Sequence, residues 1–176
     1  MQDWKGYIRK LAITVLEDAC TLFEKVLVPI DGSEHSTRAL DAAVQIAKKF
    51  KGKVTLLHIY SVDVRPVILP EPTTALPQGM PMISSAEISK IVENARQVGK
   101  GILSDGEQKA KAEGVQFESL LVEGHVVQEI IRTAKEGNFG LIVIGARGRS
   151  KIRELLLGST TDGVIHHVSL PVLVVK

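Results

Sequence analysis

Five short apolar segments, separated by stretches with the spacing of amphipathic helices, constrain the fold of this chain most strongly. Short apolar segments without helical spacing are typical of strands that are buried on both faces. Strands that alternate with helices along a chain form an open parallel sheet with helices on both of its faces. The sequence therefore predicts an α/β protein with a five-stranded parallel sheet. We expect strands at 26–30, 54–60, 115–122, 141–144 and 170–175, and helices after Ser33, from Ser84 to about Gly114, over 126–135 and over 159–168.

The composition indicates a cytoplasmic protein without a membrane span. At 176 residues the chain suits one domain with a full core and an added element. Its net charge of +2 gives no electrostatic reason to expect nucleic acid or an anionic membrane as a partner. Cys20 is the only cysteine, which excludes an intramolecular disulfide and fits a reducing compartment. Charges interrupt the apolar residues near the N-terminus, so we expect neither a secretory signal nor a bilayer span there.

Residues 1–24 are expected to form an amphipathic helix that precedes the domain at 25–176. The apolar side of this helix must pack against the domain or against a second subunit. A helix that lies on a membrane surface is the less favoured alternative, because acidic residues follow the basic ones. The apolar residues at helical spacing are Trp4, Ile8, Leu11, Val15, Ala19 and Leu22 or Phe23.

The segment 140–161 carries the pattern that is most directly tied to chemistry. An apolar strand ends at Gly145, and Gly148 and Gly158-Ser159 follow with the spacing G-x2-G-x9-G-S. Each glycine can adopt a positive φ and leave the backbone open to a ligand. The Ser159 hydroxyl can cap the next helix, whose first amides and positive dipole end favour an anion such as a phosphate chain. Turn formation without any ligand is the alternative interpretation.

This spacing is neither a Walker loop nor a G-x-G-x-x-G loop. Together with VLVPIDGS at 26–33, VTLLHIY at 54–60 and LPVLVV at 170–175, it resembles the universal stress protein family in its ATP-binding branch. The resemblance covers about 25–176 and implies a Rossmann-like fold of the adenine nucleotide alpha hydrolase type. It also implies ATP as the ligand, with Mg²⁺ or Mn²⁺ left open. The residues it assigns to the nucleotide are Pro29, Asp31, Ile59, Gly145, Arg147, Gly148, Gly158, Ser159 and Thr160.

Three of these residues have individual interpretations. Asp31 follows the first strand and is expected to contact a ribose or a metal ion, although a turn aspartate bonded to the amide of Ser33 or Glu34 is the simpler role. By resemblance, the backbone of Ile59 contacts adenine. Arg147 is the cation beside the glycines and is expected to balance phosphate charge. The sequence departs from the family at Ala146, where a small hydroxyl residue is frequent, and at Val126, where a proline is frequent.

Other features have simpler explanations. His58 within a strand is expected to be a hydrogen-bonded core residue. His166 and His167 are adjacent and cannot chelate one metal from a single helix face. Residues 61–83 form a proline-rich loop whose role stays open between a nucleotide cover, a subunit contact and an inert insertion. The longest helix begins with a Ser84/Glu87 capping box, its glycines allow a bend, and its buried stripe is expected at Ile88, Ile91, Val92, Ala95, Val98 and Ile102.

The leading hypothesis is an ATP-binding stress or regulatory protein in which nucleotide occupancy alters shape or partner choice. By resemblance, it forms a homodimer in which the edge strand 170–175 pairs with its copy in the second subunit. The helix at 1–24 could add to this dimer interface. Catalysis has less support, because no positioned base besides Asp31 is apparent. Two alternatives remain open: a slow metal-dependent ATPase that uses Asp31, and an oligomerisation module with a vestigial nucleotide site.

Overall fold

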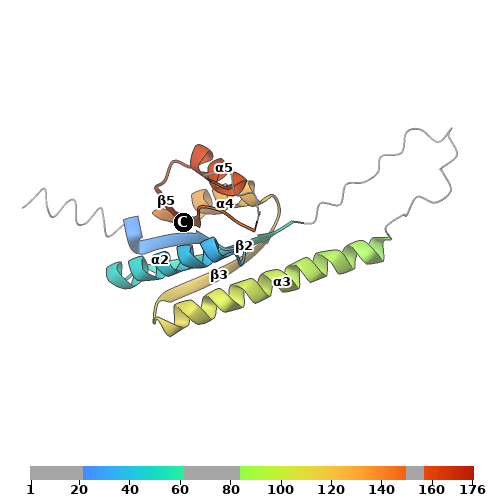
Figure 1. Cartoon of the computed structure of the whole chain (residues 1–176), viewed down its shortest axis with the longest axis horizontal. Coiled ribbons are helices and arrows are strands. Elements are labelled where there is room, and N and C mark those ends of the chain that lie inside the picture. The colour runs from blue at the N-terminus through green and yellow to red at the C-terminus, as the bar shows by residue number, and fades with distance from the viewer. Residues whose placement is uncertain (1–21, 62–83, 150–156) are drawn as a thin grey trace, which may run out of the picture.

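The computed structural model describes residues 22–61, 84–149 and 157–176. Their strands form one parallel sheet, as the sequence predicts (Figure 1). The strand order in this sheet is β3-β2-β1-β4-β5. Each strand lies within two residues of its predicted position. The strands are β1 (Lys25–Pro29), β2 (Lys53–Tyr60), β3 (Gln116–Glu123), β4 (Leu141–Gly145) and β5 (Val172–Val175).

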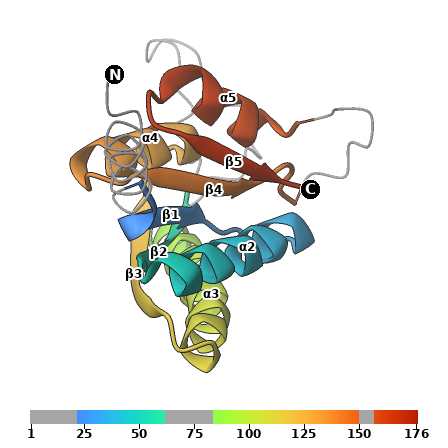
Figure 2. The same cartoon turned by 90° about the vertical axis from the view of Figure 1, so that its left-hand side faces the viewer.

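Helices cover both faces of this sheet (Figure 2). α2 (Glu34–Phe50) and α3 (Ser85–Ala112) pack on one face, and α4 (Val126–Glu136) and α5 (Ser159–His167) pack on the other. Successive residues of β1 point alternately to the two cores, since Val26 and Val28 join the α2 and α3 core while Leu27 joins the α4 and α5 core. Because both faces are covered, the central strands are apolar throughout rather than alternating.

The strand order reverses at β1. The chain passes from β1 outwards to β2 and β3, and then returns to place β4 and β5 on the other side of β1. The carboxyl ends of β1 and β4 therefore diverge into helices on opposite faces and leave space between them. Such a reversal point is where open α/β sheets bind their ligands.

The buried face of α3 differs from the prediction. Ser84 and Glu87 form the expected capping box, but Ile91 is 47% exposed and Val98 is 54% exposed. The first half of the helix extends beyond the sheet (Figure 1), so its apolar residues have no strand beneath them. The residues that α3 buries are instead Gly99, Leu103, Gly106 and Ala110.

Two glycines of α3, Gly99 and Gly106, are therefore packing positions. A Cβ at Gly106 would lie 3.2 Å from side-chain atoms of Ile30 and Leu56, so a small residue lets the helix approach the sheet. The helix runs unbroken from Ser85 to Ala112. Helical spacing alone could not separate the residues that face the sheet from those that extend past it.

Two predicted segments fall outside the described residues: most of the N-terminal helix, at 1–21, and the proline-rich loop at 62–83. Within the described ranges, no helix has both the length and the apolar character needed to span a membrane.

Candidate functional site

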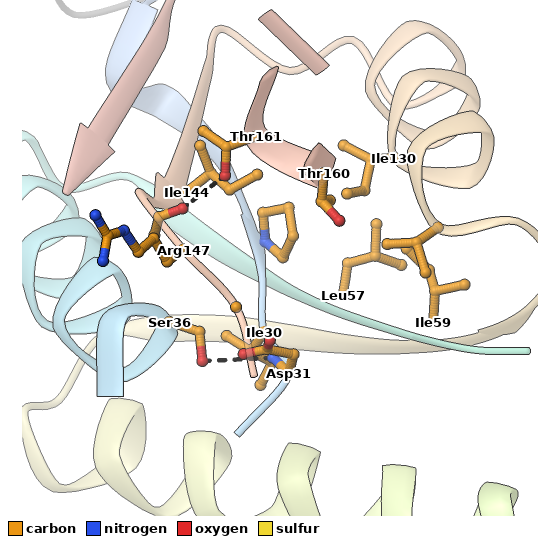
Figure 3. Close-up of a pocket in the computed structure, with 14 residues that line it drawn as sticks. Ile30, Asp31, Ser36, Leu57, Ile59, Ile130, Ile144, Arg147, Thr160 and Thr161 are labelled. Carbon is orange, nitrogen blue, oxygen red and sulfur yellow. Dashed lines mark hydrogen bonds between the residues drawn. The ribbon is translucent and has the colours of Figure 1, made fainter. Parts of the chain in front are cut away.

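A cavity opens at the carboxyl edge of the sheet, where β1 and β4 diverge (Figure 3). Its walls come from the ends of β1, β2 and β4, from the first turns of α2 and α5, and from α4. Leu57, Ile59 and Ile130 gather on one side of the cavity, and Asp31 and Arg147 lie on the other (Figure 3). The cavity thus has an apolar side and a polar side, a combination typical of small-molecule sites.

Seven of the nine candidate residues line this cavity. They come from four separate parts of the chain, and the fold brings them together. They are Pro29, Asp31, Ile59, Gly145, Arg147, Gly148 and Thr160. Gly158 lies next to the cavity wall, because its amide donates a 2.8 Å hydrogen bond to the carbonyl of Ala146. Ser159 is exposed at the start of α5 and is not part of the lining.

Asp31 has the turn role that the sequence left open, and its second carboxylate oxygen faces the loop that follows β4. One carboxylate oxygen, Oδ1, accepts a 2.9 Å hydrogen bond from the amide of Ser33, which is the turn role. The other oxygen, Oδ2, faces Gly148 so closely that a Cβ there would lie 2.6 Å from it. The carboxylate therefore stabilises the turn before α2 and also reaches the loop that follows β4.

The expected reason for the three glycines was partly wrong. None of Gly145, Gly148 and Gly158 has a positive φ. A Cβ at Gly145 would lie 2.7 Å from the carbonyl carbon of His35, so glycine is needed there for α2 to pack against β4.

Gly158 has a different environment. Its φ of −74° suits any residue. The nearest described atom to a Cβ there is the Cα of Arg147, at 3.4 Å, which is ordinary contact. Among the described residues, neither packing nor backbone conformation requires glycine at 158, whereas close approach of a ligand would.

The start of α5 also differs from the prediction. Gly158, not Ser159, occupies the N-cap position, and Ser159 is the first helical residue, so its hydroxyl cannot cap the helix as expected. Within the described ranges no side chain caps α5, whereas the Ser33 hydroxyl caps α2. The Gly158 amide is already bonded to Ala146, so the amides that remain for an anion are those of Ser159 and the residues after it.

The Arg147 side chain lies on the same side of the cavity as α2 (Figure 3). Figure 3 shows its guanidinium directed away from Leu57 and Thr160. In this arrangement the guanidinium points away from the apolar side of the cavity.

Several lining residues were missed. Ser36, Leu57, Val126, Ile130, Ile144 and Thr161 also line the cavity. Val126 and Ile130 carried a signal, because both lie on the apolar stripe of their helix, but the stripe does not distinguish core packing from cavity lining. Thr161 is 2% exposed, and its hydroxyl donates a 2.8 Å hydrogen bond to the carbonyl of Gly145.

His58 is the hydrogen-bonded core residue that was expected. His58 is 7% exposed and bonded to the carbonyl of Ile30. His167 bonds to the carbonyl of Gly163 within its own helix. In the part of the chain that the structure describes, no group of three His, Cys, Asp or Glu residues is arranged to hold a metal ion.

The model of the universal stress protein family matches residues 22–176. The chain is also 36% identical to the universal stress protein YxiE of Bacillus subtilis, over 88% of this chain and all of that protein. The chain belongs to the universal stress protein family. The predicted membership of that family is thus confirmed.

Solved structures of this family have the same fold. A universal stress protein in complex with cAMP is 27% identical, with 87% of this chain and 96% of that chain covered and a TM-score of 0.58. The universal stress protein from Archaeoglobus fulgidus, solved in complex with dAMP, is 23% identical, with 86% and 97% covered and a TM-score of 0.54. Both of these relatives are described as complexes with an adenine nucleotide.

Proposed function

We propose that this universal stress protein binds ATP in the cavity between β1 and β4 and acts as a regulatory protein in the stress response. The observation that carries the proposal is the convergence of Asp31, Gly148 and Thr160 on one cavity at the strand-order reversal. The apolar side, with Leu57, Ile59 and Ile130, suits the flat face of adenine. The polar side, with Asp31 and Gly148, suits the ribose and phosphates.

The phosphate chain is proposed to extend towards the start of α5. The amides of Ser159 and Thr160 begin this helix, where the dipole favours negative charge, and no described side chain occupies the cap. The freedom of Gly158 from packing constraints supports the same location, since a ligand that approaches the backbone would exclude a side chain there. The complexes of two relatives with cAMP and dAMP support an adenine nucleotide as the class of ligand.

The proposal is tested by isothermal titration calorimetry with ATP, ADP, AMP and cAMP. We expect the wild type to bind ATP and Gly158→Val to bind it at least tenfold more weakly, because the new side chain covers the helix amides. Gly101→Ala is the matched control, since a Cβ at this exposed position has nothing within 4 Å. A folded Gly158→Val protein that binds ATP as tightly as the wild type would contradict the proposal.

We also propose a homodimer through β5. This strand lies at the edge of the sheet, and an apolar edge strand requires a cover. Leu173 on β5 is 39% exposed and Ile165 on α5 is 38% exposed, which provides an apolar surface beside the open edge. Light scattering of the wild type and of Leu173→Lys tests this, with dimer and monomer as the expected states. A cytoplasmic location and a separate N-terminal element at 1–24 remain proposals from the sequence.

A further inference from the structure

His58 lies just outside the cavity, on the opposite face of the sheet from Leu57 and Ile59. Its Nδ1 atom lies 2.7 Å from the carbonyl oxygen of Ile30. Because a carbonyl oxygen only accepts hydrogen bonds, Nδ1 carries the proton and donates. A side chain of β2 thereby holds the backbone of the residue immediately before Asp31.

The peptide unit between Ile30 and Asp31 is held at both ends. Its carbonyl accepts from His58, and its amide, that of Asp31, donates to the Ser36 hydroxyl at 3.4 Å. The unit is planar, so the direction of the carbonyl also sets the direction in which Asp31 leaves the strand. The Ile30 amide is held too, by a 2.9 Å hydrogen bond to the carbonyl of Leu57. The position of the Asp31 carboxylate therefore depends on the His58 contact.

α3 closes the other side of the imidazole. A Cβ at Gly99 would lie 2.7 Å from Cδ2 of His58 and 3.2 Å from Nε2. The ring is thus confined between the Ile30 carbonyl and the backbone of α3, and a side chain at position 99 would displace it. Gly99 is buried at this contact, in the face that α3 packs on the sheet.

We propose that His58 is a positioning residue for the nucleotide site: its Nδ1–H holds the peptide unit between Ile30 and Asp31, and Gly99 keeps the ring in place. His58 does not line the cavity, so it acts through the Asp31 carboxylate and not by contact with the ligand. The inference rests on the proposed function, in which Asp31 contacts the nucleotide.

Three variants test the positioning role. His58→Leu removes the donor, whereas His58→Asn keeps an N–H group at the place of Nδ1. Gly99→Ala leaves His58 intact but pushes on its ring. We expect His58→Leu and Gly99→Ala to weaken ATP binding roughly tenfold, and His58→Asn to restore it to within about threefold of the wild type. Calorimetry measures affinity, and thermal melting verifies that each variant is folded.

A second readout needs no nucleotide. The amide of Ser33 donates to Asp31, so its NMR chemical shift and hydrogen exchange report the carboxylate position directly. We expect this signal to change in His58→Leu and Gly99→Ala and to stay near wild type in His58→Asn. If the wild type binds no ATP, the proposed function fails while the Ser33 signal still tests the positioning role.

Two results would overturn the inference. One is a folded His58→Leu protein with wild-type ATP affinity and an unchanged Ser33 signal. The other is His58→Asn binding ATP as weakly as His58→Leu. Should His58→Leu fail to fold, the Gly99→Ala protein decides, and wild-type affinity with an unchanged Ser33 signal would then count against the role.

Discussion

The Thr161 hydroxyl donates a 2.8 Å hydrogen bond to the carbonyl oxygen of Gly145, which joins the first turn of α5 to the end of β4. These two residues lie on either side of the loop that contains Gly148 and Gly158. The contact is buried, with Thr161 only 2% exposed. It holds the start of α5 against the cavity and places the helix amides where the proposed phosphates would lie.

Thr161→Val is expected to lower the free energy of unfolding by about 1 to 2 kcal/mol, because valine has the same shape but leaves the Gly145 carbonyl without this donor. Thr161→Ser keeps the hydroxyl and is the matched control, expected to lose less than about 1 kcal/mol. Urea unfolding measures both. Equal stability of the wild type and Thr161→Val would show that the contact does not support α5.

Gly145→Ala is expected to destabilise the protein by about 1 to 3 kcal/mol, because the new methyl group would meet the backbone of His35, which has little room to move. Gly101→Ala, on the exposed side of α3, is expected to stabilise by about 1 kcal/mol through helix propensity. Thermal or urea unfolding compares the two. An unchanged stability of Gly145→Ala would mean that α2 and β4 separate easily.

Asp31→Asn separates the turn role from the ligand role of this residue. The asparagine oxygen still accepts from the Ser33 amide, so the melting temperature should stay close to that of the wild type. The variant lacks the negative charge that would strengthen hydrogen bonds accepted from the ribose hydroxyls. We therefore expect its affinity for ATP to fall about fivefold or more. Calorimetry and melting curves give the two quantities. Loss of stability without loss of affinity would assign Asp31 to the turn alone.

Glu118 on β3 is expected to make stability depend on acidic pH. Hydrogen bonds from Lys53 and then from Thr55 hold the pKa of its carboxyl below the ordinary glutamate value of 4.5. Since the folded-state pKa is lowered, the stabilisation is complete above that ordinary value and is lost as pH falls through the folded-state pKa. The pair is partly exposed, so we expect about 0.5 kcal/mol.

Glu118→Gln is the test, because glutamine removes the charge and still accepts from Thr55, whose hydroxyl donates at 2.8 Å. The difference in unfolding free energy between pH 7 and pH 3 should be smaller in this variant than in the wild type. Glu113→Gln, which removes an exposed ion pair with Lys48, is the control for the loss of a surface carboxylate. An identical pH profile for Glu118→Gln and the wild type would refute the prediction.

The sequence alone was sufficient for the fold class and for half of the residues that line the cavity. Continuous apolar strands such as β1 and β4 occur where both faces of a sheet are covered, so their pattern implies the parallel sheet. Residues at strand ends, such as Asp31 and Gly145, collect at one edge of such a sheet whatever the details of packing. Those local signals therefore predicted the sheet and its strand positions, whereas the resemblance to the family assigned the nine candidate residues, seven of which line the cavity.

Only the tertiary structure decided what individual positions do. Gly145 is needed because His35 packs against it, and Gly99 because His58 lies beneath it; both neighbours are distant in sequence. Ile91 is exposed because α3 extends past the sheet, which helical spacing cannot reveal. The physical reason is the same in each case. Periodicity shows which residues share a face of a helix or strand, whereas contact depends on how closely a second element packs on that face and at which residues along it.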